Sequence, residues 1–358
     1  MTKAAILAAL LLLPAAARAT PAIYGFTFPS WWKDSYDQPA AKTSLANLAK
    51  TGAKWVALIP VQYMKRKDST TFDVTDQTAS DESLRRTIRD AKALGLSVVL
   101  KPHVNCADGT PTAVIRPRDE RAWFASYREF LLHYATIARE ERVELFVVGT
   151  ELFSMAAGPV HEREWQELIG GVRAVYPGKL TYAANWYDFA LIPFWRSLDY
   201  VGIDGYFPAV GGKHPRLMAA SLRAYLPAIR AVVHASGKPL LFTEVGIASQ
   251  RGANRKPWSY RDFGPVDAGV QKAYFEAFLD AFSRERSFAG FIQWCWDLNP
   301  DAGGPNDKSM TVQGKPALDV LEKYFAGLNA PALDARAAET AGAARKALAV
   351  VEAGVPVE

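Results

Sequence analysis

Short apolar runs alternate with longer amphipathic stretches along most of the chain. The runs are mostly continuous in apolar residues, which is typical of parallel strands that are buried on both faces. The strands predicted from them are 23–28, 55–60, 96–102, 143–149, 180–184, 199–203, 239–243 and 289–295. The predicted helices are 39–51, 81–94, 119–140, 162–175, 214–235, 267–286 and 315–326, with a short one at 189–196.

Eight strand–helix units within about 300 residues favour a single α/β domain, the (β/α)₈ TIM barrel. The alternative is a doubly wound open sheet, which carries a glycine-rich phosphate-binding turn after its first strand. Residues 24–30 follow the start of the first predicted strand here and contain no such turn. We therefore predict a barrel over residues 20–327, followed by an Ala-rich tail, 328–358, that is helical or disordered.

The N-terminus has the three parts of a secretory signal peptide. Lys3 precedes an apolar run over residues 4–16, and residues 17–19 (Ala-Arg-Ala) have the small-x-small pattern of a cleavage site. The run is too short to span a bilayer comfortably and contains Pro14. We expect residues 1–19 to be removed and the mature chain to be secreted or periplasmic, with no membrane partner.

Composition argues against nucleic-acid binding and against a metal or cofactor site. The net charge of +5 is small and the basic residues are scattered, so a nucleic acid is not an expected partner. The five histidines are dispersed without the spacing of a metal site, and we expect neither a metal nor a cofactor. Cys106 and Cys295 fall at the ends of the third and eighth predicted strands, which are not neighbours in a closed barrel, so we expect two unpaired thiols. We also expect a monomer.

Two glutamates follow directly on apolar strands. Glu151 lies in Gly-Thr-Glu-Leu after the fourth predicted strand, and Glu244 lies in Thr-Glu-Val-Gly after the seventh. A carboxyl group at a buried strand end is unfavourable unless it faces a polar cleft or takes part in chemistry. The C-terminal ends of the strands carry the active site of a (β/α)₈ barrel, so both side chains belong on that face. Glycoside hydrolysis uses such a pair, one carboxylic acid and one carboxylate, about 5–5.5 Å apart in retaining enzymes.

Around these glutamates the sequence resembles clan A glycoside hydrolases, and within the clan family 113, which includes retaining β-mannanases. The stretches that carry the resemblance are 148–152 (Val-Gly-Thr-Glu-Leu), 204–208 (Asp-Gly-Tyr-Phe-Pro), 243–246 (Thr-Glu-Val-Gly), 293–297 (Gln-Trp-Cys-Trp-Asp) and 313–317 (Gln-Gly-Lys-Pro-Ala). The resemblance covers about residues 22 to 327. It implies a (β/α)₈ barrel in which Glu151 is the general acid/base and Glu244 the nucleophile.

One position departs from the broad clan pattern. Thr150 stands where many clan members carry an asparagine that holds the 2-hydroxyl group of the sugar. The Thr-Glu pair agrees with family 113 and supports the narrower assignment. It leaves that hydroxyl group to other residues, for which His103, Asn105 and Asn185 are the candidates.

Aromatic residues at strand ends indicate a carbohydrate cleft, because sugars present flat C–H faces to indole and phenol rings. We expect Trp31, Trp186 and Trp296 to line it, and we also expect Trp294 and Tyr206 to bind substrate. Trp294 and Trp296 share one side of the last predicted strand by its period of two, so at most one of them fills the barrel. Trp55, Trp123 and Trp165 are expected in the core instead.

Five polar residues near strand ends have candidate roles. Tyr206 is placed to hydrogen-bond the Glu244 carboxylate and keep it ionised, with a core-edge position as the alternative. His103 ends the third predicted strand and is expected to contact substrate, with Lys101 on the same side of the strand as its partner. Asp204 and Asp297 are strand-end acids that bind hydroxyl groups or pair with nearby bases, and they rank below the two glutamates.

The sequence therefore predicts a retaining glycoside hydrolase that binds a polysaccharide or oligosaccharide, with β-1,4-linked mannan or glucomannan implied by the family resemblance. Double displacement requires no cofactor. Two alternatives remain: the same chemistry on another β-linked glycan, such as a β-glucan or an exopolysaccharide, and a non-catalytic carbohydrate-binding barrel. An enzyme of the first kind would differ from a mannanase only in the loops that select the substrate. The second would not need both glutamates, and both are present.

Overall fold

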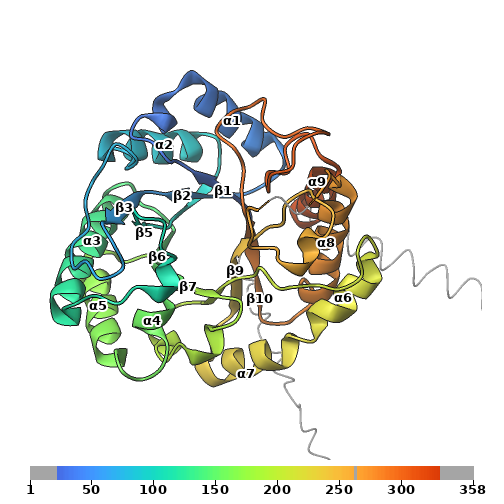
Figure 1. Cartoon of the computed structure of the whole chain (residues 1–358). Coiled ribbons are helices and arrows are strands. Elements are labelled where there is room, and N and C mark those ends of the chain that lie inside the picture. Colours follow the sequence, from blue (N-terminus) through green and yellow to red (C-terminus); the bar gives the residue numbers. More distant parts are fainter. Residues whose placement is uncertain (1–21, 262–263, 331–358) are drawn as a thin grey trace, which may run out of the picture.

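A closed barrel of eight parallel strands forms the centre of the computed structural model (Figure 1). The structure describes residues 22–261 and 264–330. The predicted signal peptide, 1–19, and residues 331–358 of the predicted tail, 328–358, lie outside the described residues, whereas residues 328–329 belong to the last helix. Around the barrel the strands are β1 (Ile23–Pro29), β2 (Trp55–Ile59), β4 (Ser97–Leu100), β6 (Leu145–Thr150), β7 (Lys179–Asn185), β8 (Val201–Asp204), β9 (Leu240–Val245) and β10 (Phe288–Gln293). β10 pairs with β1 and closes the barrel, which confirms the predicted fold and all eight of its strands.

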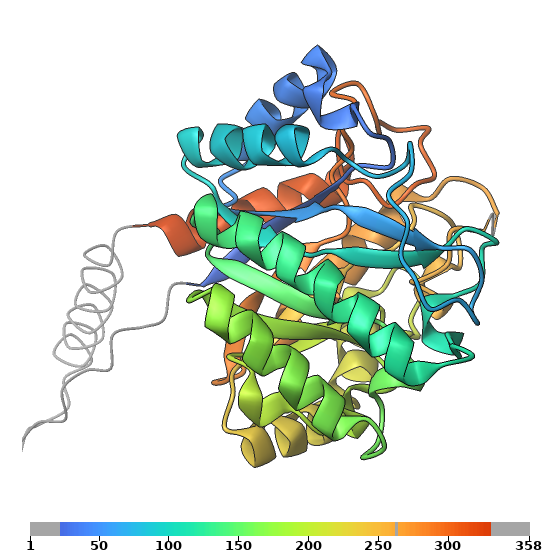
Figure 2. The same ribbon diagram turned by 90° about the vertical axis from the view of Figure 1, so that its left-hand side faces the viewer.

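Helices surround the barrel on the outside (Figure 1). They are α1 (Pro39–Lys50), α2 (Asp81–Ala93), α3 (Glu120–Glu140), α4 (Phe153–Ala156), α5 (Glu162–Val175), α6 (Pro215–Arg223), α7 (Leu226–Ser236), α8 (Ala268–Phe282) and α9 (Pro316–Asn329). Figure 2 shows the barrel from the side, with the start of β1 in dark blue and the end of α9 in red at one end. The loops that follow the strands lie at the other end.

The barrel interior changes from apolar to polar along its axis. Ile23, Val99 and Leu241 belong to an apolar cluster inside the barrel that is separate from the larger core under the helices. Because side chains alternate along a strand, the residues two positions further on point to the same side. Those residues include Lys101 and Thr243, both of which are buried. The strand ends therefore carry polar groups inward toward one face.

A second, two-stranded sheet extends β2 and β4 beyond the barrel. β3 (Val61–Met64) pairs in parallel with β5 (His103–Cys106). Pro60 and Pro102 separate these short strands from β2 and β4, and proline has no N–H group to donate to a ladder. Pairing resumes directly after them, where the His103 N–H donates to the Pro60 carbonyl at 2.9 Å. His103 and Asn105 thus lie on β5 and not at the end of the third barrel strand.

Two predicted helices differ from the structure. The stretch predicted as one helix over 214–235 is divided into α6 and α7, because Pro227 in the first turn of α7 cannot donate to a continuous helix and its ring would clash with the preceding turn. The short helix predicted at 189–196 is two 3₁₀ turns, Phe189–Leu191 and Trp195–Ser197. Further 3₁₀ turns lie at Ser35–Asp37, Thr112–Val114 and Ala253–Arg255.

Candidate active site

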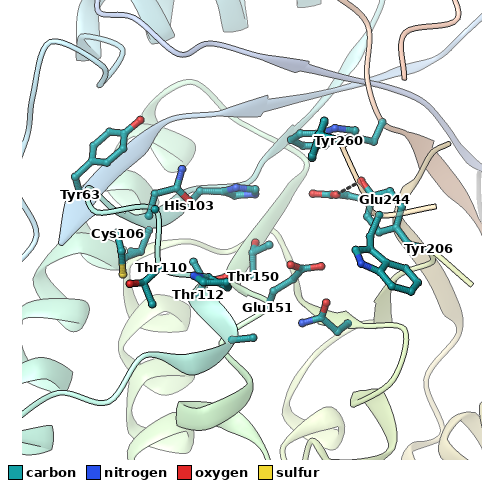
Figure 3. A pocket seen from close by; sticks show the side chains of 18 of the residues that line it. Tyr63, His103, Cys106, Thr110, Thr112, Thr150, Glu151, Tyr206, Glu244 and Tyr260 are labelled. Atoms are coloured by element: carbon teal, nitrogen blue, oxygen red, sulfur yellow. Dashed lines mark hydrogen bonds between the residues drawn. The ribbon is translucent and has the colours of Figure 1, made fainter. Parts of the chain in front are cut away.

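A cleft of about 930 Å³ opens at the C-terminal end of the barrel strands. Glu151 and Glu244 both line it, and Figure 3 shows their carboxyl groups pointing toward the same space. Seven of the eight residues predicted to bind substrate also line it: Trp31, His103, Asn105, Asn185, Trp186, Tyr206 and Trp294. Their contact with a substrate stays a prediction.

Trp296 is the exception, and its predicted place in the cleft was wrong. Its side chain is buried in the core, where it packs against Phe26 and donates its indole N–H to Ser44 at 2.9 Å. β10 ends at Gln293, so strand alternation no longer relates Trp294 to Trp296. Trp294 instead belongs to the cleft, and Trp296 joins the barrel to the region around α1.

Glu151 is held by its backbone at the end of β6. Its φ of 54° is left-handed, a conformation that non-glycine residues adopt at an energetic cost of about 1–3 kcal/mol. The neighbouring barrel strand stabilises it, because the Glu151 N–H donates to the Ala183 carbonyl at 2.8 Å. The next N–H, of Leu152, donates to the Tyr182 hydroxyl, also at 2.8 Å. The direction of the Glu151 side chain is therefore fixed by β7.

The surroundings of Glu151 favour its protonated form. Burial raises the pKa of the Glu151 carboxyl well above its ordinary value, and the nearby carboxyl groups of Asp204 and Glu244 raise it further. The Lys101 ammonium acts in the opposite direction and does not outweigh them. A carboxyl group that keeps its proton near neutral pH can act as a general acid.

Glu244 has the opposite surroundings. It is buried at the end of β9, and its Oε2 accepts a hydrogen bond from the Tyr206 hydroxyl at 2.5 Å, as predicted (Figure 3). Its Oε1 accepts a hydrogen bond from the Lys101 ammonium. Two donors, one of them charged, stabilise the carboxylate form of a buried acid. This glutamate is therefore arranged as an anion, while Glu151 is arranged as an acid.

Lys101 belongs to a buried cluster that sequence reasoning missed. Its Nζ lies 3.2 and 3.3 Å from the two carboxylate oxygens of Asp204, and Asp204 accepts a further hydrogen bond from Thr243 at 2.7 Å. The predicted pairing of Lys101 with His103 was wrong, because the lysine points into the barrel toward β8 and β9. The sequence did contain one indication of this direction. Lys101 lies two residues after Val99, which points into the barrel, and side chains two positions apart on a strand point to the same side.

Charges inside this cluster act on one another. Burial raises the pKa of Asp204 to about 7, with a further upward effect from Glu244 that Lys101 and Thr243 oppose. Burial lowers the pKa of Lys101, but the neighbouring carboxylates outweigh it and raise the value overall, so the ammonium stays charged. One cation thus faces three carboxyl groups.

Several cleft residues present polar atoms that are free to meet a ligand. Among the described residues, His103 Nε2, Thr150 Oγ1, Asn185 Nδ2 and Trp294 Nε1 are buried and have no hydrogen-bond partner. Burial, together with the Lys101 charge, lowers the pKa of His103 well below its ordinary value, so its imidazole is neutral. A buried polar atom is stabilised only when it finds a partner, and hydroxyl groups of a sugar can supply one.

Aromatic rings form two walls of the cleft. On one side Trp186 stacks on Trp258, with ring centroids 5.3 Å apart and an angle of 25° between the rings. On the other side Trp294 lies between Trp31, at 6.3 Å, and His103, whose ring is parallel to it at 6.4 Å. Trp123 and Trp165 are fully buried in the core, as predicted, and Trp55 packs partly buried against the cluster inside the barrel.

Sequence reasoning also missed Tyr63, Trp258 and Tyr260, which line the cleft from β3 and from the loop after β9. Their side chains are aromatic, but no strand pattern relates them to the barrel face. Asp297, the second lower-ranked acid, does not line the cleft and accepts a hydrogen bond from the Asn299 N–H at 2.8 Å.

Cys106 and Cys295 are free thiols, as predicted. Over residues 22–261 and 264–330, no group of three or more His, Cys, Asp or Glu side chains is arranged to hold a metal ion. In the same part of the chain no helix has both the length and the apolar character to cross a membrane.

Comparison with known proteins places the chain in a family. The sequence profile of Glycoside Hydrolase Family 113 matches residues 24–315. The solved structure of the GH113 β-mannanase from Alicyclobacillus acidocaldarius is 32% identical, with a TM-score of 0.79 over 87% of this chain and 99% of that one. Another GH113 β-1,4-mannanase is 30% identical, with a TM-score of 0.78 over 85% and 98% of the two chains.

A more distant structure, a GH5_18 protein from Streptomyces cattleya, shares the fold at 15% identity, with a TM-score of 0.61 over 88% of this chain and 82% of that one. A comparison with curated proteins finds no match. The family profile spans the whole barrel and both strand-end glutamates, so this chain belongs to glycoside hydrolase family 113 and is an O-glycosyl hydrolase.

Proposed function

We propose that this protein is a retaining glycoside hydrolase that cleaves β-1,4-linked mannan or glucomannan by double displacement. The observation that carries the proposal is the unequal environment of the two cleft glutamates. Glu244 receives hydrogen bonds from Tyr206 and Lys101, while burial and neighbouring carboxyl groups favour the proton on Glu151. A retaining mechanism needs this division between nucleophile and acid.

In the first step the Glu244 carboxylate attacks the anomeric carbon, while Glu151 donates its proton to the leaving glycosidic oxygen. The bond to the leaving sugar breaks and a covalent glycosyl-enzyme forms. In the second step Glu151, now ionised, removes a proton from water, and the resulting oxygen nucleophile displaces Glu244. Both glutamates return to their starting protonation states.

The substrate class rests on the relatives and on the cleft. The two family 113 structures with about one third identity are described as a β-mannanase and a β-1,4-mannanase. The cleft offers stacked indole rings for sugar faces and unpartnered polar atoms on His103, Thr150 and Asn185 for sugar hydroxyl groups. A β-1,4-linked mannosyl chain presents both kinds of surface.

We further propose that the mature enzyme is exported and acts as a monomer. The basic, apolar and small-residue segments of 1–19 support export. An enzyme that acts on a polymer outside the cell would meet its substrate there.

The test uses the mature protein with Glu151→Gln and Glu244→Gln, and Glu82→Gln on the exposed side of α2 as a matched control. Each is incubated with mannan, glucomannan, xylan and β-glucan, and products are followed by NMR. Release of mannose-containing oligosaccharides with the β-anomer first, lost in both active-site variants and kept in the control, is the expected result. Undiminished activity in either variant would end the assignment of that glutamate. Products with the inverted anomeric configuration would refute the retaining mechanism. Release of oligosaccharides from β-glucan alone would show that β-glucan, and not mannan, is the substrate.

A further inference from the structure

Two buried carboxyl groups, those of Asp204 and Glu244, share one buried ammonium group at the mouth of the barrel. The Lys101 Nζ contacts Glu244 Oε1 and both carboxylate oxygens of Asp204. Lys101 and Asp204 are 1% and 0% exposed, and neither lines the cleft that Glu151 and Glu244 face. Any effect of this pair on the reaction must therefore be indirect and pass through residues that line the cleft, with Glu244 in direct contact with Lys101.

We propose that Lys101 and Asp204 are a positioning pair for these glutamates, which rests on the catalytic roles proposed for Glu151 and Glu244. Asp204, held by Thr243, orients the Lys101 ammonium onto the nucleophile carboxylate. The opposite charges of the pair act in opposite directions on the proton of the acid, Glu151. The pair thereby orients the Glu244 carboxyl group and tunes the proton affinity of Glu151.

The geometry explains why two residues are needed. Two ionised carboxylates on adjacent strands repel one another strongly when both are buried, unless a cation lies between them. Lys101 bridges Asp204 on β8 and Glu244 on β9 and supplies that cation. Removal of Asp204 would leave the ammonium without the partner that fixes its direction. Removal of Lys101 would leave the carboxylates unneutralised.

Among the described residues, the charged groups that act on the pair and on Glu151 include strand-end residues and Asp188, which follows β7 and raises the pKa of Glu151. Lys101 is influenced by Asp204, Glu244 and Glu151, and its own charge acts on His103. Asp204 is influenced by Glu244 and Lys101, and its charge also acts on the Tyr206 hydroxyl.

The sign of the expected effect follows from the environment of Glu151. Its pKa is raised by burial first, then by Asp204 and Glu244, and Lys101 opposes them. The alkaline limb of kcat/KM reports loss of the proton from the free enzyme's acid. Neutralising Asp204 lowers the pKa of Glu151 and moves this limb to lower pH, whereas neutralising Lys101 raises it and moves the limb to higher pH. If the two residues had only a structural role, the alkaline limb would stay at the same pH in both variants.

The experiment compares pH profiles of kcat/KM on a mannan oligosaccharide for Asp204→Asn and Lys101→Met. We expect limb shifts of opposite direction, each on the order of one pH unit. Lys101→Met also loses a donor to the nucleophile, so its maximal kcat/KM falls at least about tenfold. Shifts in the same direction, or none, would overturn the proposal.

Thr243→Val keeps the experiment decisive if either charge variant fails to fold. It preserves side-chain volume and removes only the hydrogen bond that favours the ionised form of Asp204. Asp204 then carries less negative charge at a given pH, so the limb moves in the direction of Asp204→Asn by a smaller amount. An unmoved limb in folded Thr243→Val would also overturn the proposal.

Lys315→Met is the matched control for a buried lysine. Lys315 pairs with Asp307 at 2.5 Å and with Ser249 at 2.9 Å in the segment before α9, and it does not line the cleft. We expect a lower melting temperature and an unmoved alkaline limb. If Lys315→Met shifts the alkaline limb as far as Lys101→Met does, loss of any buried cation causes the shift, and the proposed role of Lys101 and Asp204 is refuted.

A substrate with a good leaving group separates this inference from the proposed function. A 2,4-dinitrophenyl β-mannoside needs no proton from an acid, so its kcat/KM survives in Glu151→Ala while that of the oligosaccharide is lost. Equal loss on both substrates would overturn the proposed role of Glu151. If the leaving-group dependence holds while the limb shifts are absent, only the positioning pair is refuted.

Discussion

The hydrogen bond between Tyr206 and Glu244 gives the most direct test of how the nucleophile is held. The phenol hydroxyl donates to Oε2 at 2.5 Å, and both side chains are buried, at 5% exposure each. Tyr206→Phe removes this donor and leaves the ring, so the wall of the cleft keeps its shape. Lys101 remains as the donor to Oε1.

The size of the effect follows from the charge on the acceptor. A hydrogen bond to a charged group contributes about 1.5–3 kcal/mol, and loss of a partner leaves a buried carboxylate short of one donor. Because about 1.4 kcal/mol is a factor of ten in rate, Tyr206→Phe is expected to lower kcat/KM about 10- to 150-fold. The orientation of the attacking oxygen is lost together with the hydrogen bond, so we expect kcat to fall more than KM rises.

Steady-state kinetics on a mannan oligosaccharide measure the effect, with Tyr176→Phe as the matched control. Tyr176 is also buried, and its hydroxyl donates to the Val143 carbonyl at 2.8 Å, before the start of β6. The control is expected to lose about 1 kcal/mol of unfolding free energy and to keep kcat/KM within about twofold. An equal loss of kcat/KM in both variants, or full activity in Tyr206→Phe, would refute the reasoning.

Three more substitutions test the packing of the site. Gly149→Ala places a Cβ 2.9 Å from both the Trp165 and the Tyr182 rings, so we expect a loss of about 1–3 kcal/mol in urea unfolding; an unchanged midpoint would contradict it. Trp258→Ala removes one ring of the stacked pair, and we expect KM for long oligosaccharides to rise about tenfold while kcat stays nearly constant; an unchanged KM would remove this ring from the binding surface. Trp296→Phe loses the indole donor, so we expect about 1 kcal/mol lower stability and an unaltered KM, and a raised KM would return this residue to the cleft.

Much of the fold was predictable because the barrel strands satisfy a simple rule. Each parallel strand is covered on both faces, so its residues are mostly apolar, and all eight runs were visible in the sequence. The same rule located Glu151 and Glu244 at the cleft, because strand ends share one face of a barrel. The sheet formed by β3 and β5 was not predicted, since it depends on pairing resumed after Pro60 and Pro102.

The errors at the site arise where the periodic rule stops. Trp294 and Trp296 are two residues apart, yet the Trp294 N–H donates to Val245 and the Trp296 N–H donates to Thr27, on opposite sides of β10. Alternation describes a strand and fails once the chain leaves it. Trp258 lies in the loop after β9, whose path no period describes.

Lys101 shows a different kind of limit. Its inward direction follows from the alternation of β4, but its partners lie on β8 and β9, across the barrel in the strand order. Which inward side chains meet depends on strand tilt and on the stagger of neighbouring strands, and the sequence of one strand does not contain either. The two glutamates look equivalent in the sequence, as acids at the ends of apolar strands. Their difference arises because Lys101 and Tyr206 both reach Glu244, so the chemical division between the two acids is a property of the closed barrel rather than of either motif.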